Sequence, residues 1–338
     1  MKDRAMKPVF LSLALLALLL PVAAQADTPT APAPLDDPSW RAPHAPYHII
    51  DNIWYVGTAG IGVYLISTDQ GHILIDSGPD GTAPIVEANI QALGFKLKDI
   101  HYIVETHAHY DHVGSMAQLK ADTGAEVVSS ADDQFALENG RRDGDNIYGP
   151  GAFPPVKVDA TIDEGGTITL SSTTLMAHMT PGHTKGDTSW TMTAINNGVP
   201  YRVLFYGSTT VAGNVLVDNK AYPNIVRDYR ISFDRLAGIK PDIFLANHPG
   251  FANMEAKYQE SLKAKYPEDQ AKPFIDPAEF PAFIAQSQAD FEAELKRQQD
   301  AAAAAAPVAT PAAATATSPA VVPIVPSSAG ISVTEKRP

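Results

Sequence analysis

The chain has 338 residues, of which 45% are hydrophobic, and 25 Lys and Arg stand against 38 Asp and Glu, giving a formal net charge of −13. This acidic balance argues against a general affinity for nucleic acid or for an anionic membrane surface, and it favours bound cations. Cys is absent from the sequence, which excludes a disulfide scaffold, a thiolate nucleophile, an iron–sulfur cluster and any Cys-based zinc site. A metal site would therefore have to use Asp, Glu and the 10 His.

Residues 1–26 predict a secretory signal peptide. A basic start is followed by the apolar stretch Val9–Leu20 and by a small-x-small cleavage site at Ala24-Gln25-Ala26. A membrane anchor is the alternative, but a bilayer requires about 20 apolar residues and this stretch is shorter. We therefore expect cleavage after Ala26, a periplasmic location and no stable membrane insertion of the mature chain.

Residues 27–300 carry the alternating pattern of a folded α/β domain. The first half predicts a hairpin of two strands, a helix, a strand, a helix and a strand, at Gly62–Ser67, His72–Asp76, Thr82–Leu93, Ile100–Thr106, Ser115–Thr123 and Ala125–Ser130. A long loop at Asn139–Pro155 follows. The second half predicts four strands and then a helix, a strand and a helix, at Thr167–Leu170, Thr174–Thr180, Ser189–Ile195, Tyr201–Tyr206, Asn224–Leu236, Asp242–Leu245 and Pro277–Gln298.

The two halves share one order, strands first and helices after, with a histidine motif at a strand end in each. That order predicts two sheets packed face to face with helices outside, an αββα sandwich, and a site along one edge. The last 38 residues, 301–338, contain 13 Ala and 6 Pro and predict a disordered tail, because proline interrupts helices and bulky apolar residues are few.

One segment carries the chemistry. His107-Ala108-His109-Tyr110-Asp111-His112 places three imidazoles and a carboxylate within six positions. If His107 and His109 end a strand, their side chains point the same way, and a following helix presents Asp111 and His112 to a neighbouring point. One segment of this kind can serve two adjacent metals. Imidazole and carboxylate without thiolate suit Zn²⁺, and Fe, Mn and Co remain open by ligand type.

Two further histidines stand directly after predicted strands. His183 lies in Thr180-Pro181-Gly182-His183-Thr184, and His248 lies in Ala246-Asn247-His248-Pro249. Either residue alone is more often a hydrogen-bonded loop histidine. Together with the cluster they complete six ligands at strand ends, where α/β folds place their sites.

The motifs His-x-His-x-Asp-His and Gly-His-Thr, followed by a third lone His after a strand, resemble the metallo-β-lactamase superfamily from about Tyr47 to Phe291. The resemblance implies the αββα fold and a dinuclear zinc site. It implies that His107, His109 and His183 hold one Zn²⁺, and that Asp111, His112 and His248 hold the other. Asp111 would also orient the attacking zinc-bound hydroxide, which is its catalytic role.

The superfamily contains several chemistries. Its thioesterases, lactonases and nucleases add a bridging Asp between the second and third motifs, where this chain has Ser208. In that respect the chain resembles subclass B3 metallo-β-lactamases, which use hydroxyls at the positions of Ser208 and Thr210 to hold the substrate carboxylate. Two features depart from the subclass pattern: many members have a C-terminal disulfide, and the position of Thr210 is more often Ser.

The resemblance therefore predicts a monomeric β-lactamase that acts on penicillins, cephalosporins and carbapenems, opens the cyclic amide, confers antibiotic resistance and binds no nucleic acid. A related dinuclear zinc hydrolase of a lactone or thioester is the enzymatic alternative. An exported zinc-binding or scavenging protein is the non-catalytic one, suggested by the acidic charge and the His content.

Four other residues are candidates for supporting roles. Asp76, at a strand end, is expected either to orient a ligand histidine or to cap a turn. Tyr148, in the long loop, together with Trp54 and Phe153, is expected to wall the cleft, with core packing as the alternative for Trp54. The remaining histidines are given no functional role: His44, His48, His72, His101 and His178.

Overall fold

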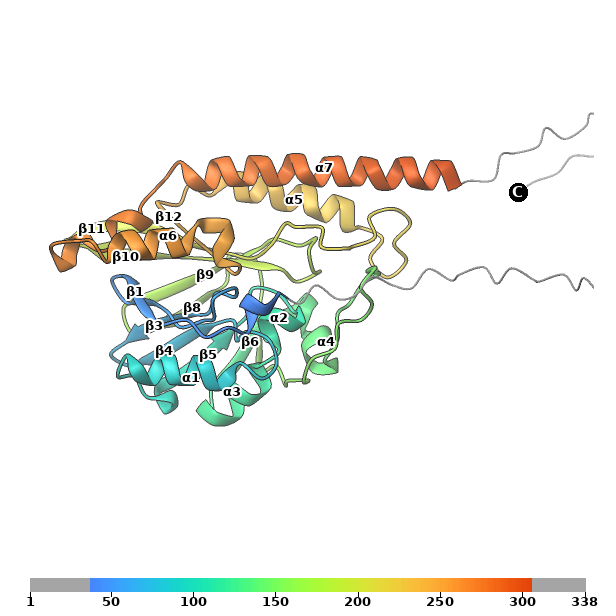
Figure 1. The fold of residues 1–338 in the computed structure, drawn as a ribbon. Coiled ribbons are helices and arrows are strands. Elements are labelled where there is room, and N and C mark those ends of the chain that lie inside the picture. The colour runs from blue at the N-terminus through green and yellow to red at the C-terminus, as the bar shows by residue number, and fades with distance from the viewer. Residues whose placement is uncertain (1–36, 306–338) are drawn as a thin grey trace, which may run out of the picture.

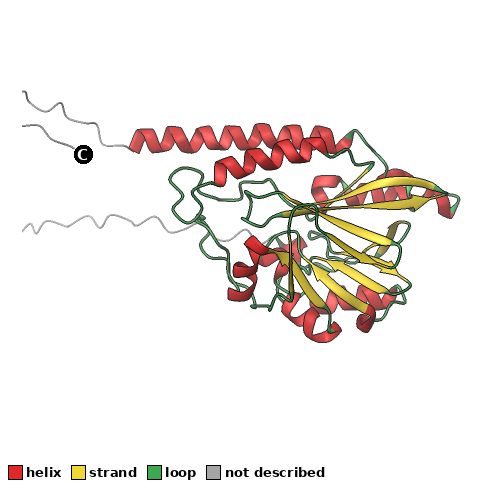
Figure 2. Cartoon of the chain, turned by 180° about the vertical axis from the view of Figure 1, so that it is seen from behind, coloured by secondary structure: helices red, strands yellow, loops and turns green. Residues whose placement is uncertain are grey.

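The computed structural model describes residues 37–305 and consists of two stacked β-sheets with helices on both outer faces (Figure 1; Figure 2). The expected αββα sandwich is confirmed. The predicted signal peptide and most of the predicted tail lie outside the described residues. Within residues 37–305, no helix has the length and apolar character that crossing a bilayer requires.

The first sheet has seven strands in chain order, antiparallel up to β4 and parallel from β4 to β7. These strands are β1 (Tyr47–Ile50), β2 (Ile53–Tyr55), β3 (Tyr64–Thr68), β4 (Gly71–Ile75), β5 (Ile100–Val104), β6 (Glu126–Ser130) and β7 (Ala160–Ile162). The predicted hairpin is the pair β3–β4, in which Leu65 faces Leu74.

The second sheet has five strands in the order β12-β11-β10-β9-β8 and is antiparallel except for the parallel pair β11–β12. Its strands are β8 (Thr167–Leu170), β9 (Thr173–Met179), β10 (Thr188–Asn196), β11 (Val199–Tyr206) and β12 (Ile243–Ala246).

Within the described residues, seven α-helices flank the sheets: α1 (Ala83–Ala92), α2 (Tyr110–Val113), α3 (Met116–Thr123), α4 (Ala131–Asn139), α5 (Ile225–Gly238), α6 (Met254–Ser261) and α7 (Glu279–Ala305). Short 3₁₀ helices lie at Pro38–Trp40, Leu97–Asp99, Pro249–Ala252, Pro267–Asp269 and Lys272–Phe274. Helices α1 and α3 cover the first sheet, whereas α5 and α7 lie over the second (Figure 1).

Local chemistry explains where two of these helices lie. Helix α1 presents Val86 and Ile90 to the core and ends before Gly94, whose φ of +88° suits glycine. Helix α4, which the sequence analysis did not predict, begins where the Ser130 hydroxyl accepts a hydrogen bond of 3.1 Å from the Asp133 N–H. The sequence of α4 has only a weak apolar periodicity, so the pattern did not predict a helix there.

Helix α7 corrects one predicted boundary. Residues 301–305 were assigned to the disordered tail, but the helix continues through them to Ala305. Alanine has the highest helix propensity, and the first proline of the tail comes only at Pro307. The alanine run therefore extends the helix rather than ending it.

Two apolar cores hold the layers together. Between the sheets, buried aromatic and branched side chains such as Tyr64, Trp190 and Phe205 interlock. A second core, which includes Val86, Leu74 and Leu119, lies between the first sheet and its helices. This rigid frame fixes the loops that follow β5, β9, β11 and β12 at one edge of the sandwich.

Candidate metal centre

Six predicted ligands converge in two neighbouring groups of three. His107, His109 and His183 form one group, which we call the histidine triad. Asp111, His112 and His248 form the other, the mixed triad. In each group, one ligand atom per residue lies within 4.8 Å of the other two. The structure thus brings together all six residues that the sequence analysis singled out, in the two expected sets.

The loop that carries the first four ligands differs from expectation in one respect. Strand β5 ends at Val104, so His107 and His109 lie in the loop beyond it and not in the strand. His109 directly precedes helix α2, whose first turn contains Asp111 and His112. The loop curls back on itself, and the His109 N–H donates to the His107 carbonyl at 2.9 Å.

The ring nitrogens of the histidine triad have the geometry of metal ligands. The Nε2 atoms of His107 and His183 lie 3.1 Å apart, and the buried Nε2 of His109 has no hydrogen-bond partner. Two ring nitrogens at that distance repel each other when both carry lone pairs, which is the ligating form, and an orphaned buried nitrogen is costly. A cation shared by all three nitrogens removes both problems.

Hydrogen bonds fix the ring of His183. Its Nδ1 lies 2.7 Å from the carbonyl oxygen of Thr210, which can only accept, so Nδ1 carries the proton. The Nε2 lone pair is then free and faces the triad. A bond of this kind orients a ligand imidazole and raises its basicity.

The mixed triad is equally compact. His112 Nε2 lies 3.2 Å from His248 Nε2 and 3.2 Å from Asp111 Oδ2. His248 Nε2 is 3.5 Å from the same Asp111 oxygen. Behind His112, Asp76 Oδ2 lies 3.4 Å from Nδ1, while the other contacts of this carboxylate are to Thr106. Asp76 thus lies behind a ligand histidine without a hydrogen bond to its Nδ1, so its orienting role stays a prediction.

The charge states of the buried ligands follow from burial and from one another. Burial, reinforced by neighbouring imidazoles, lowers the pKa of His107 and His109 well below the usual value. Burial also lowers the pKa of His183 to about 3 and that of His248 to about 4. These four imidazoles are neutral at pH 7, which is the form that ligates a metal.

The remaining two ligands form a charged pair. Burial opposes the ionised carboxylate of Asp111, but the positive charge of His112 outweighs burial and lowers the carboxyl pKa. Burial likewise opposes a charged His112, and the neighbouring Asp111 carboxylate overcomes it and raises the His112 pKa to about 10. A cation bound in the mixed triad would displace this proton, because only the neutral imidazole ligates a metal. An ionised carboxylate among imidazoles is a donor set that suits a divalent cation, Zn²⁺ above all.

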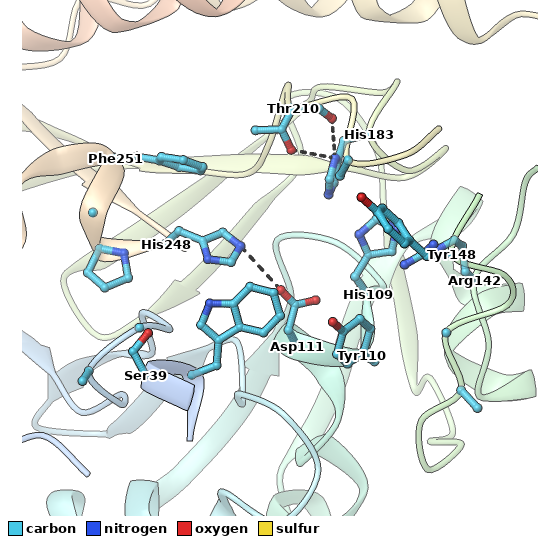
Figure 3. A pocket seen from close by; sticks show the side chains of 18 residues that line it. Ser39, His109, Tyr110, Asp111, Arg142, Tyr148, His183, Thr210, His248 and Phe251 are labelled. Carbon is cyan, nitrogen blue, oxygen red and sulfur yellow. Dashed lines mark hydrogen bonds and ion pairs between the residues drawn. The ribbon is translucent and has the colours of Figure 1, made fainter. Parts of the chain in front are cut away.

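A cavity of about 710 Å³ opens above the two triads. His109, Asp111, His183 and His248 are exposed to it, and side chains from distant segments wall it (Figure 3). Its aromatic walls are Trp40, Tyr110, Tyr148 and Phe251. A volume of this size falls in the range of small-molecule sites.

Ser208 and Thr210 differ in their access to this cavity. Thr210 lines it, with its hydroxyl 3.3 Å from His183 Nδ1. Ser208 is only 2% exposed, and its Oγ lies 3.1 Å from Thr210 Oγ1. The Thr210 N–H also donates to Ser208 Oγ at 3.2 Å. Ser208 thus does not line the cavity and lies behind Thr210, so direct contact between its hydroxyl and a substrate stays a prediction.

Two of the expected cleft residues belong to the core instead. Trp54 packs at 5.4 Å from the ring of Phe95 and donates from Nε1 to Ser67 Oγ. Phe153 is buried in the core beneath the first sheet. Both lie outside the cavity wall, so only Tyr148 of the three predicted wall residues is found there.

Sequence reasoning missed other wall residues, namely Trp40, Tyr110, Arg142 and Phe251. Tyr110 lies inside the histidine cluster, which was a usable signal, whereas Trp40 and Phe251 come from segments far from the motifs. The five histidines without an assigned role lie outside both triads and outside the cavity wall.

Comparisons with known proteins agree with this site. The family model described as the metallo-beta-lactamase superfamily matches residues 60–248, more than half of the chain. The chain therefore belongs to the metallo-β-lactamase superfamily, a group of metallo-hydrolases. Within it, the chain groups with enzymes of subclass B3, as the solved structures indicate.

BJP-1, a subclass B3 metallo-β-lactamase of Bradyrhizobium japonicum, is 42% identical, with a TM-score of 0.73 over 78% of this chain and 98% of that chain. FEZ-1, the metallo-β-lactamase of Legionella gormanii, is 34% identical, with a TM-score of 0.70 over 77% of this chain and 98% of its own.

Curated relatives point to a second activity in the superfamily. A hydroxyacylglutathione hydrolase of Rhodospirillum rubrum is 32% identical over 108 residues, which is 32% of this chain. The match spans only 34% of that relative's length, so it covers about a third of the hydrolase.

Proposed function

We propose that the chain is a zinc-dependent β-lactamase that opens the lactam amide of penicillins, cephalosporins and carbapenems. The observation that carries the proposal is the cavity floor, where two ligand triads lie side by side with the Thr210 hydroxyl at their margin. The similarity of the whole folded domain to BJP-1 supports it further. We also propose export to the periplasm and a contribution to antibiotic resistance, which the sequence of residues 1–26 motivates.

The donor set fits two Zn²⁺, one in each triad. The histidine triad would hold the first through His107, His109 and His183, and the mixed triad the second through Asp111, His112 and His248. Bound zinc supplies Lewis acidity and makes water nucleophilic at neutral pH. The absence of a covalent nucleophile motif fits a reaction in which water attacks directly.

The chain's own residues position the substrate. The Thr210 hydroxyl, held by Ser208, can donate to the carboxylate that β-lactams carry beside the lactam nitrogen. The ionised Asp111 carboxylate can accept a hydrogen bond from the attacking water and orient it. Trp40, Tyr110 and Phe251 provide apolar walls that exclude bulk water and strengthen these interactions.

Thioester hydrolysis is the second candidate, because the curated relatives include hydroxyacylglutathione hydrolases. Ser208 argues against thioester hydrolysis, because the thioesterases of the superfamily that this chain resembles carry an Asp at the matching position. A lactonase is disfavoured for the same reason.

Purified mature protein loaded with zinc tests the proposal against this alternative. Rates are measured with a cephalosporin (nitrocefin), a hydroxyacylglutathione thioester and an acyl-homoserine lactone. Cleavage of the cephalosporin with a kcat/KM at least about 100-fold above the other two supports the β-lactamase, and a preference for the thioester or the lactone overturns it.

A further inference from the structure

Arg142 stands out among the wall residues of the cavity. It lies in the loop between α4 and β7, and its side chain lies next to His109 and Tyr148 (Figure 3). Nη1 donates to the Gly149 carbonyl oxygen at 3.3 Å, while Nε is buried and has no hydrogen-bond partner. Among the described residues, no carboxylate forms an ion pair with this guanidinium.

Two other arginines of the described chain are paired with carboxylates. Arg230 forms a two-pronged pair with Glu292, both bonds at 3.0 Å, and Arg235 pairs with Glu164 at 2.9 Å. Those arginines lie outside the cavity, whereas Arg142 lines it without an ion-pair partner among the described residues, although the charge of the Asp111 carboxylate favours its protonated form. Burying a cation without a partner costs free energy, and burial lowers the pKa of Arg142 accordingly. An anionic ligand entering the cavity would supply the missing partner.

The surroundings leave the guanidinium free for this role. Lys185, a neighbouring cation, is already paired with Asp143 at 2.7 Å. Gly151 lies against the guanidinium, and a Cβ there would lie 3.2 Å from Arg142 Nη2. Gly151 also has a φ of +52°, a conformation that favours glycine. The loop thus keeps space around Arg142 on the cavity side.

The position of Arg142 indicates which part of a substrate it meets. His248 of the mixed triad lies on one side of the cavity, and Arg142 lies on the other, beyond His109 (Figure 3). In a β-lactam, the lactam nitrogen and the carbon bearing the acylamino group are bonded to opposite sides of the carbonyl carbon. With the nitrogen directed to the mixed triad, the acylamino group extends past the histidine triad toward Arg142.

We propose that Arg142 is a specificity-determining residue that binds a carboxylate on the acyl side chain of β-lactam substrates. The planar guanidinium offers a fork of donors that matches a carboxylate. This inference rests on the proposed β-lactamase function. It adds a preference for substrates with two carboxylates, one beside the lactam nitrogen and one on the acyl group.

Two penicillins that differ by one group provide the test. Carbenicillin carries a carboxylate on the carbon next to the acyl carbonyl, where benzylpenicillin has a hydrogen. Their KM and kcat are measured with the zinc-loaded wild-type enzyme, Arg142→Gln, Arg142→Lys and the control Arg141→Gln. Arg141 is exposed and lies against Phe135, outside the cavity wall, so its loss tests the general effect of removing one positive charge from this loop.

Arg142→Gln is expected to reduce kcat/KM for carbenicillin about 10- to 100-fold, the range of a hydrogen bond to a charged group, mainly through a higher KM. The same variant should change benzylpenicillin by less than about threefold, because that acyl group offers no anion. Arg142→Lys should give a kcat/KM for carbenicillin between those of the wild type and Arg142→Gln, because lysine keeps the positive charge but lacks the planar pair of donors. Arg141→Gln should leave both substrates unchanged.

A binding measurement gives a readout independent of turnover. Calorimetry of the two hydrolysed penicillins with wild-type enzyme should show tighter binding of the carbenicillin product, and Arg142→Gln should abolish the difference. If Arg142→Gln lowers kcat/KM equally for both penicillins, Arg142 binds the carboxylate that they share. If kcat/KM falls for neither, Arg142 only stabilises the loop. Either result overturns this inference and leaves the proposed function standing. A wild-type enzyme that hydrolyses neither penicillin overturns the proposed function, and the inference falls with it.

Discussion

Asp133 connects the two loops that carry the histidine triad, and its removal should weaken metal binding. This buried carboxylate accepts hydrogen bonds from Ala108 N at 2.9 Å, from Thr184 Oγ1 at 2.8 Å and from Gly186 N at 3.0 Å. Ala108 lies between His107 and His109, and Thr184 follows His183. A side chain on α4 thereby fixes the spacing of all three ligands.

The magnitude follows from the groups left behind. Asp133→Ala strands two buried N–H groups, each at about 1–3 kcal/mol, so the free energy of unfolding should fall by about 2–6 kcal/mol. Asp133→Asn keeps one acceptor oxygen and should lose about half as much. Residues that orient metal ligands typically contribute about 10- to 100-fold to metal affinity, and zinc affinity of the histidine triad should fall by that factor.

Unfolding in guanidinium chloride measures the change in stability, and competition for zinc with a chromophoric chelator measures the change in zinc affinity. Asp132→Ala is the matched control, because Asp132 is exposed in the same helical turn and should change stability by less than about 0.5 kcal/mol. An Asp133→Ala protein with wild-type stability and wild-type zinc affinity would refute the reasoning.

The other predictions concern the two triads and the substrate pocket. His248→Ala leaves the mixed triad with two ligands and should weaken its zinc far more than that of the histidine triad; equal losses in a zinc titration would contradict this partition. Thr210→Val should lower kcat/KM for penicillins about 10- to 100-fold at unchanged zinc content, whereas Ser208→Ala, acting only through Thr210, should cost less; the reverse order in steady-state kinetics would assign the contact to Ser208. Gly207→Ala should destabilise the fold by about 1–3 kcal/mol or more in thermal unfolding, because its Cβ would lie 2.3 Å from Asp187 Oδ1; an unchanged melting temperature would exclude that clash.

The strands and helices with strong periodicity were predictable from the sequence. The β3–β4 hairpin, α1 and the β8–β11 strands match the predicted ranges within two residues at each end. Short elements without such a pattern were missed, including β1, β2, α4 and α6. Helix α4 lacks an apolar stripe because its buried face includes the polar Asp133, whose partners come from distant segments.

For the site, the sequence predicted ligands better than walls. His107, His109 and His112 stand within one short segment, so their chemistry is visible from spacing alone. The wall residues meet only after folding: Trp40 comes from the segment before β1 and Phe251 from the segment after β12, and both approach His248, at 5.4 Å between rings in each case. Tertiary packing, which local sequence does not encode, decides such contacts.

Metal-dependent turnover of a carbapenem tests the central claim most directly. The mature protein is assayed with imipenem as purified, after EDTA treatment, and after zinc is restored, with zinc per chain determined in each state. The account predicts two zinc ions per active chain, loss of hydrolysis with EDTA and recovery with zinc. Turnover that persists in metal-free protein, or a chain with both triads filled that leaves imipenem intact along with every other β-lactam, would contradict it.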